Sequence, residues 1–226
     1  MGEGRSSDVR MARVRRSKEE ARAAYDRMSA WYDLLAGASE VKHMRAGLRQ
    51  LAPREGERIL EIGFGTGKAL ASLTRSVGPS GRVYGVDLSA GMAGQAERRL
   101  EAAGARGEAA LILGDGARLP LADGVVDGVF MSFTLELFDT PRVPRVLGEC
   151  RRVLGQGGRL GVVSLAKRGA ANPSVRLYEW VHNRMPRYVD CRPIPVRQVL
   201  EEAGFTVVNL ERRSMWTLPV DVVLVR

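Results

Sequence analysis

Short apolar runs alternate with helical patterns along the chain from residue 58 onward. Each run has the length of a single strand, and between the runs apolar residues recur about every three or four positions, as on one face of a helix. We expect strands at 58–62, 82–86, 108–113, 125–131, 159–165, 205–210 and about 218–225. We expect helices at 68–77, from an N-cap at Ser89 to Ala103, from Pro141 or Pro144 to Leu154, and at 196–203. Strands that alternate with helices predict an α/β fold, a doubly wound and mostly parallel sheet with helices on both faces.

Two segments stand outside this alternation. Residues 1–57 have helical patterns, with helices expected at 17–30 and 40–51. The stretch at about 167–192 is too long for a simple connection after the fifth strand. A turn is expected at 156–158, directly before that strand. The sequence thus predicts an N-terminal arm and helical cap at 1–57 and a domain at 58–226 with a lid insertion at about 167–192.

Composition narrows the class of protein. With 226 residues, 45% of them hydrophobic, the chain can bury a sizeable core as a single domain with extensions. Two cysteines are too few for a disulfide scaffold or a four-cysteine zinc site, and with two histidines no metal site is expected. No apolar run approaches the roughly 20 residues needed to span a bilayer, and the Arg-rich N-terminus has no apolar signal core. A cytoplasmic location is therefore expected.

The net charge of +9 is unevenly distributed along the chain. Residues 1–58 carry 13 basic and 9 acidic side chains, residues 59–139 carry 7 and 10, and residues 140–226 carry 15 and 7. The densest basic run, 10–18, contains no aromatic residue. Because a nucleic-acid footprint concentrates on one face, often with interleaved aromatic residues, no nucleic-acid partner is expected.

A glycine-rich turn at 63–67 follows the first predicted strand and opens a helix. Ligands of open α/β sheets bind beyond the carboxyl ends of the strands, where glycines permit close approach and a helix N-terminus presents free amides. Asp87 ends the next strand and suits the two hydroxyls of a ribose, and Asp115 follows the third strand and suits an exocyclic amine. A nicotinamide dehydrogenase is the competing interpretation, but its G-x-G-x-x-G/A spacing fails at Lys68 and at Leu70.

These motifs resemble those of class I S-adenosylmethionine-dependent methyltransferases over about residues 58–165. The matching segments are EIGFGTG (61–67), VYGVD (83–87), GDGARLP (114–120), DGVF (127–130) and RVLGQGGR (152–159). The resemblance implies S-adenosylmethionine as cofactor and a Rossmann-like sheet of seven strands that closes with an antiparallel hairpin. It implies cofactor-binding roles for ten residues: Glu61, Gly63, Gly65, Thr66, Gly67, Asp87, Leu88, Asp115, Gly116 and Ser132.

The resemblance also assigns these residues to parts of the cofactor. The residues of the glycine turn would hold the methionine end, and Asp87 would bind the ribose. Asp115 and Gly116 would bind the adenine, and Ser132 would face the sulfonium or the methionine portion.

The acceptor is suggested by the segments that flank the cofactor motifs. YDRMSAWYDLL (25–35) and CRPIPVR (191–197) are similar to parts of the menaquinone/ubiquinone-biosynthesis C-methyltransferases, which implies a small or lipophilic acceptor, with a quinol type favoured. That group carries an Arg-Asn pair after the fourth strand, where this chain reads FTLELFD (133–139). A phospholipid or other small-molecule N-methyltransferase is one alternative, and a non-catalytic cofactor-binding partner subunit is another.

Methyl transfer from a sulfonium is an in-line displacement that depends mainly on holding donor and acceptor close together. A base is needed only where the acceptor loses a proton, and the catalytic residues stay unassigned. The candidates are Tyr25, Tyr32, Glu136 and His182. Glu136 follows the fourth strand, close to where the methyl group should emerge, although a rim residue or helix cap is the simpler interpretation. His43 is expected to be a surface or packing residue.

Residues 172–189 combine apolar residues at helical spacing with three arginines. Three interpretations stay open: a lid over the acceptor, an interfacial helix on an anionic membrane, and a packed helix with a solvated arginine rim. For a lipophilic acceptor we expect peripheral contact with an anionic membrane. The oligomeric state stays open.

Overall fold

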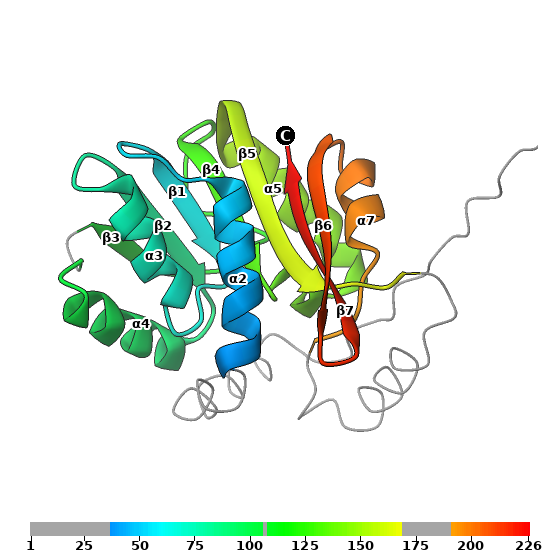
Figure 1. Cartoon of the computed structure of the whole chain (residues 1–226). Helices are drawn as coiled ribbons and strands as arrows, with labels where there is room; N and C mark the ends of the chain where they lie inside the picture. The colour runs from blue at the N-terminus through cyan, green and yellow to red at the C-terminus, as the bar shows by residue number, and fades with distance from the viewer. Residues whose placement is uncertain (1–36, 106–107, 169–190) are drawn as a thin grey trace, which may run out of the picture.

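The computed structural model describes residues 37–105, 108–168 and 191–226 of the chain. In this part of the chain seven strands form one sheet in the order β3-β2-β1-β4-β5-β7-β6, parallel except for the antiparallel β7 (Figure 1). The strands are β1 (Arg58–Ile62), β2 (Arg82–Asp87), β3 (Ala109–Leu113), β4 (Val126–Ser132), β5 (Leu154–Leu165), β6 (Val207–Met215) and β7 (Leu218–Val225). The helices are α2 (Gly37–Leu51), α3 (Lys68–Val77), α4 (Ala90–Ala102), α5 (Val143–Val153) and α7 (Val196–Glu202), with the 3₁₀ turns η1 (Leu135–Leu137) and η2 (Thr140–Arg142). The predicted doubly wound α/β fold is confirmed.

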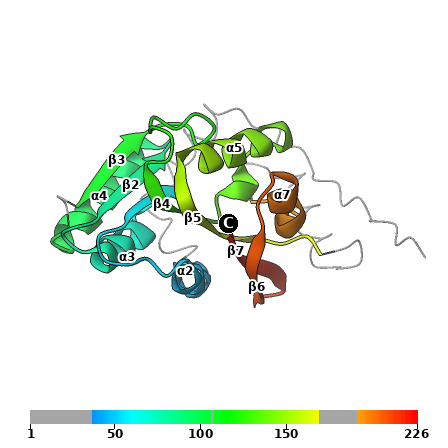
Figure 2. The ribbon, with the colours of Figure 1, turned by 90° about the horizontal axis from the view of Figure 1, so that it is seen from above.

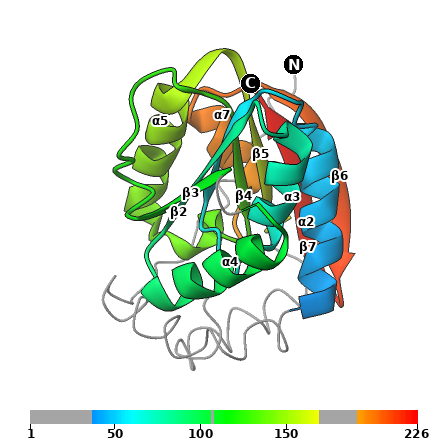
Figure 3. The ribbon, with the colours of Figure 1, turned by 90° about the vertical axis from the view of Figure 1, so that its left-hand side faces the viewer.

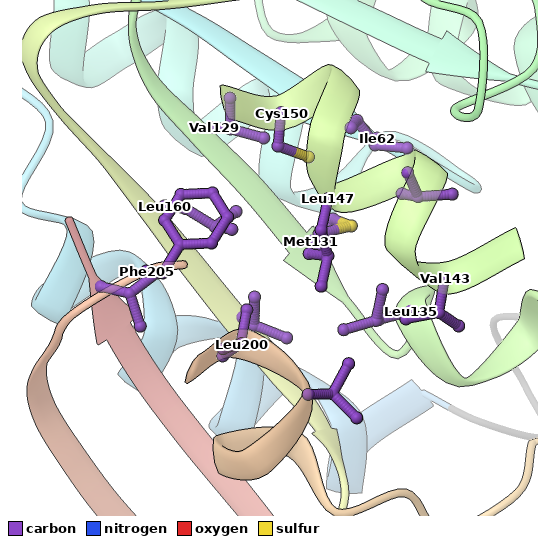
Figure 4. Close-up of a cluster of buried hydrophobic side chains, with 14 of the residues drawn as sticks. Ile62, Val129, Met131, Leu135, Val143, Leu147, Cys150, Leu160, Leu200 and Phe205 are labelled. Carbon is purple, nitrogen blue, oxygen red and sulfur yellow. The ribbon is translucent and has the colours of Figure 1, made fainter. Parts of the chain in front are cut away.

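Helices cover both faces of the sheet (Figure 2, Figure 3). α2, α3 and α4 lie on one face, where their apolar side chains join a buried cluster with β4 and β5. α5 and α7 lie on the other face, and Figure 4 shows Leu147 and Cys150 of α5 beside Met131 of β4. Cys150 is a free cysteine that is fully buried there, so it packs as a small apolar core residue.

The close packing of α2 depends on Gly47. A Cβ at this position would lie 2.4 Å from Cγ2 of Val163 in β5 and 2.9 Å from Cε2 of Phe130 in β4. The helix therefore lies directly on the centre of the sheet, with its N-terminal end near the carboxyl ends of the parallel strands, at the bottom of Figure 1. The helix predicted at 40–51 is confirmed and begins earlier, at Gly37.

The start of β5 differs from the prediction. The strand begins at Leu154, which pairs with Val126 of β4, rather than at 159. Gly128 of β4 then pairs with Arg159, so the residues expected to form a turn at 156–158 are an irregular bulge within the strand. Gly157 adopts a φ of 76° in this bulge, a conformation that glycine tolerates without strain.

β6 is longer than predicted. It ends at Met215, which pairs with Leu218 of β7, whereas the apolar pattern ends at 210. Of the added residues 211–215, the first four are Glu, Arg, Arg and Ser, so they lack the apolar positions that mark a strand in the sequence. The ladder with β7, rather than burial, holds this part of β6 in place.

The order of the strands defines where a ligand would bind. β1 has β2 on one side and β4 on the other, both parallel to it, so the winding of the chain reverses between β1 and β4. In open α/β sheets ligands bind beyond the carboxyl ends of the strands at such a switch point. The residues that follow β1, β2, β3 and β4 are therefore the candidates for a site.

Candidate active site

The turn between β1 and α3 is built on three glycines with positive φ, 73° at Gly63, 50° at Gly65 and 79° at Gly67. A Cβ at Gly63 would lie 2.4 Å from Thr134, and a Cβ at Gly67 would lie 2.8 Å from Ala96 of α4. A Cβ at Gly65 would meet no atom of the described residues within 4 Å. Two glycines thus allow close packing, and the third leaves an open surface at the start of α3, where backbone amides can bind an anionic group.

Asp87, the last residue of β2, contacts this turn. Its Oδ2 accepts a hydrogen bond from the Gly65 amide at 2.9 Å, and its Oδ1 accepts one from the Ser89 amide at 2.9 Å. Ser89 is the N-cap of α4, as predicted, and its hydroxyl accepts from the Met92 amide. Asp87 and the neighbouring Leu88 are half-buried, so two of the predicted cofactor residues lie at the surface of the switch point beside the glycine turn.

Glu61 is buried in β1, with 3% of its surface exposed. Burial, and secondly the charge of Asp87, raise the pKa of its carboxyl well above the usual range, whereas the Leu70 amide lowers it. Its Oε2 has no hydrogen-bond partner among the described residues. Burial therefore disfavours the ionised form of the Glu61 carboxyl.

Thr66 is held by an arginine that the sequence did not single out. Nη1 of Arg99 in α4 donates to Thr66 Oγ1 at 2.8 Å and to the Thr66 carbonyl oxygen. The bond ties the glycine turn to α4 across the same contact that Gly67 makes with Ala96. No local signal separates Arg99 from the adjacent Arg98, because the helical pattern marks both only as polar positions.

Asp115 and Gly116, which follow β3, form the other end of the site. Asp115 Oδ1 accepts from the Ala117 amide at 3.0 Å, and Oδ2 accepts from Nη2 of Arg142 at 2.5 Å. The Arg142 guanidinium also lies 5.9 Å from the centre of the Phe138 ring. A Cβ at Gly116 would lie 3.0 Å from Phe138 Cζ, so the ring covers this glycine. Arg142 and Phe138 are the partners of the predicted adenine residues that sequence reasoning missed.

The segment after β4 joins the glycine turn. Ser132 ends β4 and is half-buried. Thr134 Oγ1 donates toward the Ser132 carbonyl at 3.1 Å and toward the Gly63 carbonyl at 3.5 Å. Between them Phe133 is buried at a φ of 52°, an uncommon conformation for a bulky residue, and its amide donates to the Val163 carbonyl of β5 at 2.7 Å. The predicted residue Ser132 therefore lies beside the glycine turn.

Glu136 follows in η1 and is fully buried. Its Oε1 accepts a hydrogen bond from the Leu165 amide of β5 at 3.1 Å. Burial raises the pKa of the carboxyl to about 7, and the charge of Glu40 adds to this, whereas the Leu165 amide and the Ser164 hydroxyl lower it. The simpler expectation of a rim residue does not describe this buried side chain.

His43 of α2 packs against the same segment. It is 1% exposed, and its ring meets the Phe133 ring edge-on with centroids 6.4 Å apart. Burial lowers the pKa of the imidazole, and the charges of Lys42 and Arg213 lower it further. Of the two roles expected for His43, a surface residue or a packing residue, this position agrees with packing. Tyr25, Tyr32 and His182, the other candidates for catalysis, lie outside the described residues.

Comparison with known proteins places this geometry in a class. A methyltransferase domain model matches residues 59–158. The chain is 26% identical to the demethylmenaquinone methyltransferase of Symbiobacterium thermophilum, over 91% of this chain and 92% of that protein. It is 33% identical to the ubiquinone/menaquinone biosynthesis C-methyltransferase UbiE of Paracoccus denitrificans, over 71% of this chain and 60% of that protein.

Two solved structures share the fold. A SAM-dependent methyltransferase from Aquifex aeolicus superposes with a TM-score of 0.61 at 24% identity, over 80% of this chain and 88% of that one. The [4+2]-cyclase SpnF superposes with a TM-score of 0.77 at 16% identity, over 96% of this chain and 98% of that one. At these identities the likeness concerns the fold alone.

The switch-point site and these matches together define a class I S-adenosylmethionine-dependent methyltransferase. Within this class the chain resembles the demethylmenaquinone and ubiquinone/menaquinone-biosynthesis C-methyltransferases. The residues present fit S-adenosylmethionine, because the open face of Gly65, the half-buried Asp87 carboxylate and the Asp115 carboxylate line one edge of the sheet. Among the described residues, none of the helices has the length and apolarity needed to cross a bilayer.

Proposed function

We propose that this methyltransferase transfers a methyl group to a lipophilic, quinol-type acceptor. The observation that carries the proposal is the extent of the similarity to the demethylmenaquinone methyltransferase of S. thermophilum. The methyltransferase model matches only 59–158, whereas this relative aligns over 91% of the chain and so includes much of the terminal segments expected to meet the acceptor.

The residues that follow the carboxyl ends of β1, β2 and β3 would hold S-adenosylmethionine, which supplies an electrophilic methyl group on a sulfonium. Backbone groups at the open surface beside Gly65 would bind its methionine end, with Arg99 fixing the turn through Thr66. Asp87, already oriented by the Gly65 amide, would accept from the ribose hydroxyls, and Asp115 would accept from the adenine amine. Such fixed hydrogen-bond partners reduce the entropy lost when donor and acceptor are brought together.

An amine acceptor, as in a phospholipid N-methyltransferase, is the second candidate. It is favoured by the sequence after β4, where the segment FTLELFD (133–139) contains no Arg-Asn pair of the kind that the quinone methyltransferases carry. Glu136 and Glu40 interact electrostatically, so this part of the site carries acids that would suit a cationic or amine-bearing substrate.

The experiment is a methyl-transfer assay with labelled S-adenosylmethionine. Reduced demethylmenaquinone with a short prenyl chain is compared with phosphatidylethanolamine in detergent micelles, after calorimetry has confirmed that the protein binds the donor. We expect label on the quinol. Label on the amine alone would replace the quinol proposal by the second candidate, and label on neither acceptor would contradict both.

For a lipophilic acceptor we also propose peripheral contact with anionic membranes. In support, Lys42, Arg45 and Arg49 are exposed along α2, and Trp216 is 75% exposed at the turn between β6 and β7. Tryptophan favours the membrane interface, and basic side chains are attracted to anionic headgroups. Co-sedimentation with vesicles containing phosphatidylglycerol, but not with pure phosphatidylcholine vesicles, is the expected result, and equal recovery with both would contradict it.

A further inference from the structure

The carboxyl group of Glu136 accepts a hydrogen bond from a β5 amide that has no partner in β4, because β4 ends before it. β4 stops at Ser132, and the chain turns away at Phe133, so the next amide on that side of β5, that of Leu165, faces no strand. Glu136 Oε1 accepts from this amide at 3.1 Å. One carboxyl oxygen therefore has a structural task that the amide oxygen of a glutamine would perform equally well.

The other oxygen has no such task. Oε2 of Glu136 is buried and has no hydrogen-bond partner among the described residues. A buried polar atom without a partner costs free energy, and where one persists in a native structure it calls for an explanation such as a catalytic role. The cost of burying this carboxyl also rises when it ionises, because an ionised group is more expensive to bury than a neutral one.

The position of Glu136 supplies the explanation. Two residues before it, Thr134 contacts the carbonyl of Gly63 in the glycine turn, so η1 begins beside the place where the methionine end of the cofactor is expected. Ser132, expected to face the sulfonium, ends the adjacent strand. Glu136 thus lies just after the carboxyl end of β4 and against that of β5, close to the predicted cofactor residues.

The surroundings adjust the proton affinity of this carboxyl toward neutral pH. From α2, the negative charge of Glu40 disfavours ionisation of Glu136, and burial disfavours it more. The backbone amide of Glu136 itself favours ionisation, as do the Leu165 amide and the Ser164 hydroxyl of β5. The resulting pKa of about 7 is suited to a group that takes up and releases a proton at neutral pH.

We propose that Glu136 is the general base of this methyltransferase and that its unpartnered Oε2 receives the proton that the acceptor loses. The inference rests on the proposed function, in that an acceptor with a dissociable proton is methylated. The quinol O–H bond breaks and its proton passes to Oε2. The electron pair, shared through the ring, forms the bond between a ring carbon and the methyl group, while the bond from methyl to sulfur breaks with its pair on sulfur.

The remaining protons balance without a further reactant. The proton of the methylated ring carbon moves to the oxygen when aromaticity returns, and the proton on Glu136 leaves to water. One proton is therefore released for each methyl group transferred.

The primary test is Glu136→Gln, which keeps the volume of the side chain and an acceptor for the Leu165 amide. Loss of a general base lowers rates by about 10²- to 10⁴-fold. We expect kcat for the short-chain demethylmenaquinol to fall by this factor, with unchanged affinity for S-adenosylmethionine by calorimetry. The wild-type kcat/KM should rise through about pH 7, and the variant should lose this limb. A variant with a wild-type rate and pH profile would show that Glu136 only accepts the hydrogen bond from the Leu165 amide and is not the base.

Two further variants keep the test decisive if Glu136→Gln does not fold. Glu40→Gln removes the neighbouring negative charge, so the pH limb of kcat/KM should move to lower pH, and an unmoved limb would contradict the proposal. Glu202→Gln, an exposed change of the same kind on α7, should leave rate and profile unchanged. If Glu202→Gln lowered the rate as Glu136→Gln does, the effect would not belong to the base and the proposal would be wrong.

A measurement without substrate provides an independent readout. Because the pKa of Glu136 is raised in the folded state, its contribution to stability is present at low pH and is lost as pH rises toward about 7. The melting temperature of Glu136→Gln minus that of the wild type should therefore increase between pH 5 and pH 8. A constant difference would mean that Glu136 does not titrate in this range. If the wild type methylates no acceptor but the pH-dependent difference in melting temperature appears, the proposed function is wrong, while the titration of Glu136 in this pH range is supported.

Discussion

The residues at the carboxyl ends of β1 to β4, here called the carboxyl edge, differ in how well their role can be predicted from the sequence. Asp87 is recognisable because it ends an apolar run that follows a glycine turn, and parallel neighbouring strands bring these two features together. The bond from Arg142 to Asp115 spans 27 residues, and that from Arg99 to Thr66 spans 33. No local pattern records such pairs, because each depends on how a helix or turn lies against the sheet. The burial of Glu136 was unpredictable for the same reason.

The first prediction at this scale concerns Asp87. Replacing it with alanine removes the carboxylate expected to accept from the ribose and releases the Gly65 and Ser89 amides. Loss of one or two charge-assisted hydrogen bonds should weaken binding of S-adenosylmethionine by about 10- to 100-fold. Calorimetry with the purified variant measures this directly.

Asp127→Ala is the matched control. Its carboxylate also accepts from a backbone amide, that of Arg58 at 2.7 Å, but Asp127 lies near the start of β4, away from the carboxyl edge. Affinity for the cofactor should stay at the wild-type value in this variant. Equal losses in both variants would mean that Asp87 acts through stability rather than through contact.

At the scale of elements, the sequence succeeds where an apolar run ends at a turn signal. β1 and α3 have the predicted bounds, since the glycines at 63–67 separate a buried run from a helical pattern. The sequence fails where hydrogen bonding continues without burial, as in the bulge at the start of β5 and the polar end of β6. Strand length there is decided by the neighbouring strand, which a local pattern does not contain.

At the contact between α3 and α4, one glycine substitution is expected to destabilise the fold and another to stabilise it. Gly67→Ala places a Cβ 2.8 Å from the backbone of Ala96 at a φ of 79°, so strain and overpacking should destabilise the fold by about 1–3 kcal/mol. Gly94→Ala, inside α4, meets only Arg98 Nη1 at 3.7 Å and should stabilise it by about 0.5–1 kcal/mol. Chemical denaturation of the two variants measures both changes.

These two variants control for each other, because both add one methyl group near the same helix. A similar loss in each would show that α4 tolerates no added volume, and the specific role of Gly67 would be wrong. A stable Gly67→Ala protein with weakened cofactor binding would instead place the effect in the shape of the glycine turn.

At the scale of the whole molecule, ionisable groups fall into two sets with opposite effects. Glu57 beside Arg159 and Glu149 beside Arg152 have lowered pKa values. Buried acids at the carboxyl edge, Glu61 and Glu136, have raised ones. The fold class was predictable because periodicity reports on the sheet and its helices, but this division was not, since it depends on burial and on partners distant in the chain.

The last prediction concerns the pH of greatest stability. Acids with lowered pKa values lose their stabilising effect as pH falls below their ordinary value of 4.5. Glu136 and Glu61 act in the other direction, since each favours the protonated form when folded and destabilises the fold as pH rises above 4.5, for Glu136 up to about 7. His43, with a lowered pKa, restores part of this stability as pH rises toward 6.5.

The free energy of unfolding should therefore be greatest between about pH 5 and 6.5 and should fall toward pH 8, although the chain carries a net charge of +9. Urea denaturation at a series of pH values checks this expectation. The maximum should move to higher pH in Glu136→Gln, because the variant lacks one of the two opposing carboxyls. A stability that rises steadily to pH 8 in the wild type would contradict the raised pKa values of Glu61 and Glu136.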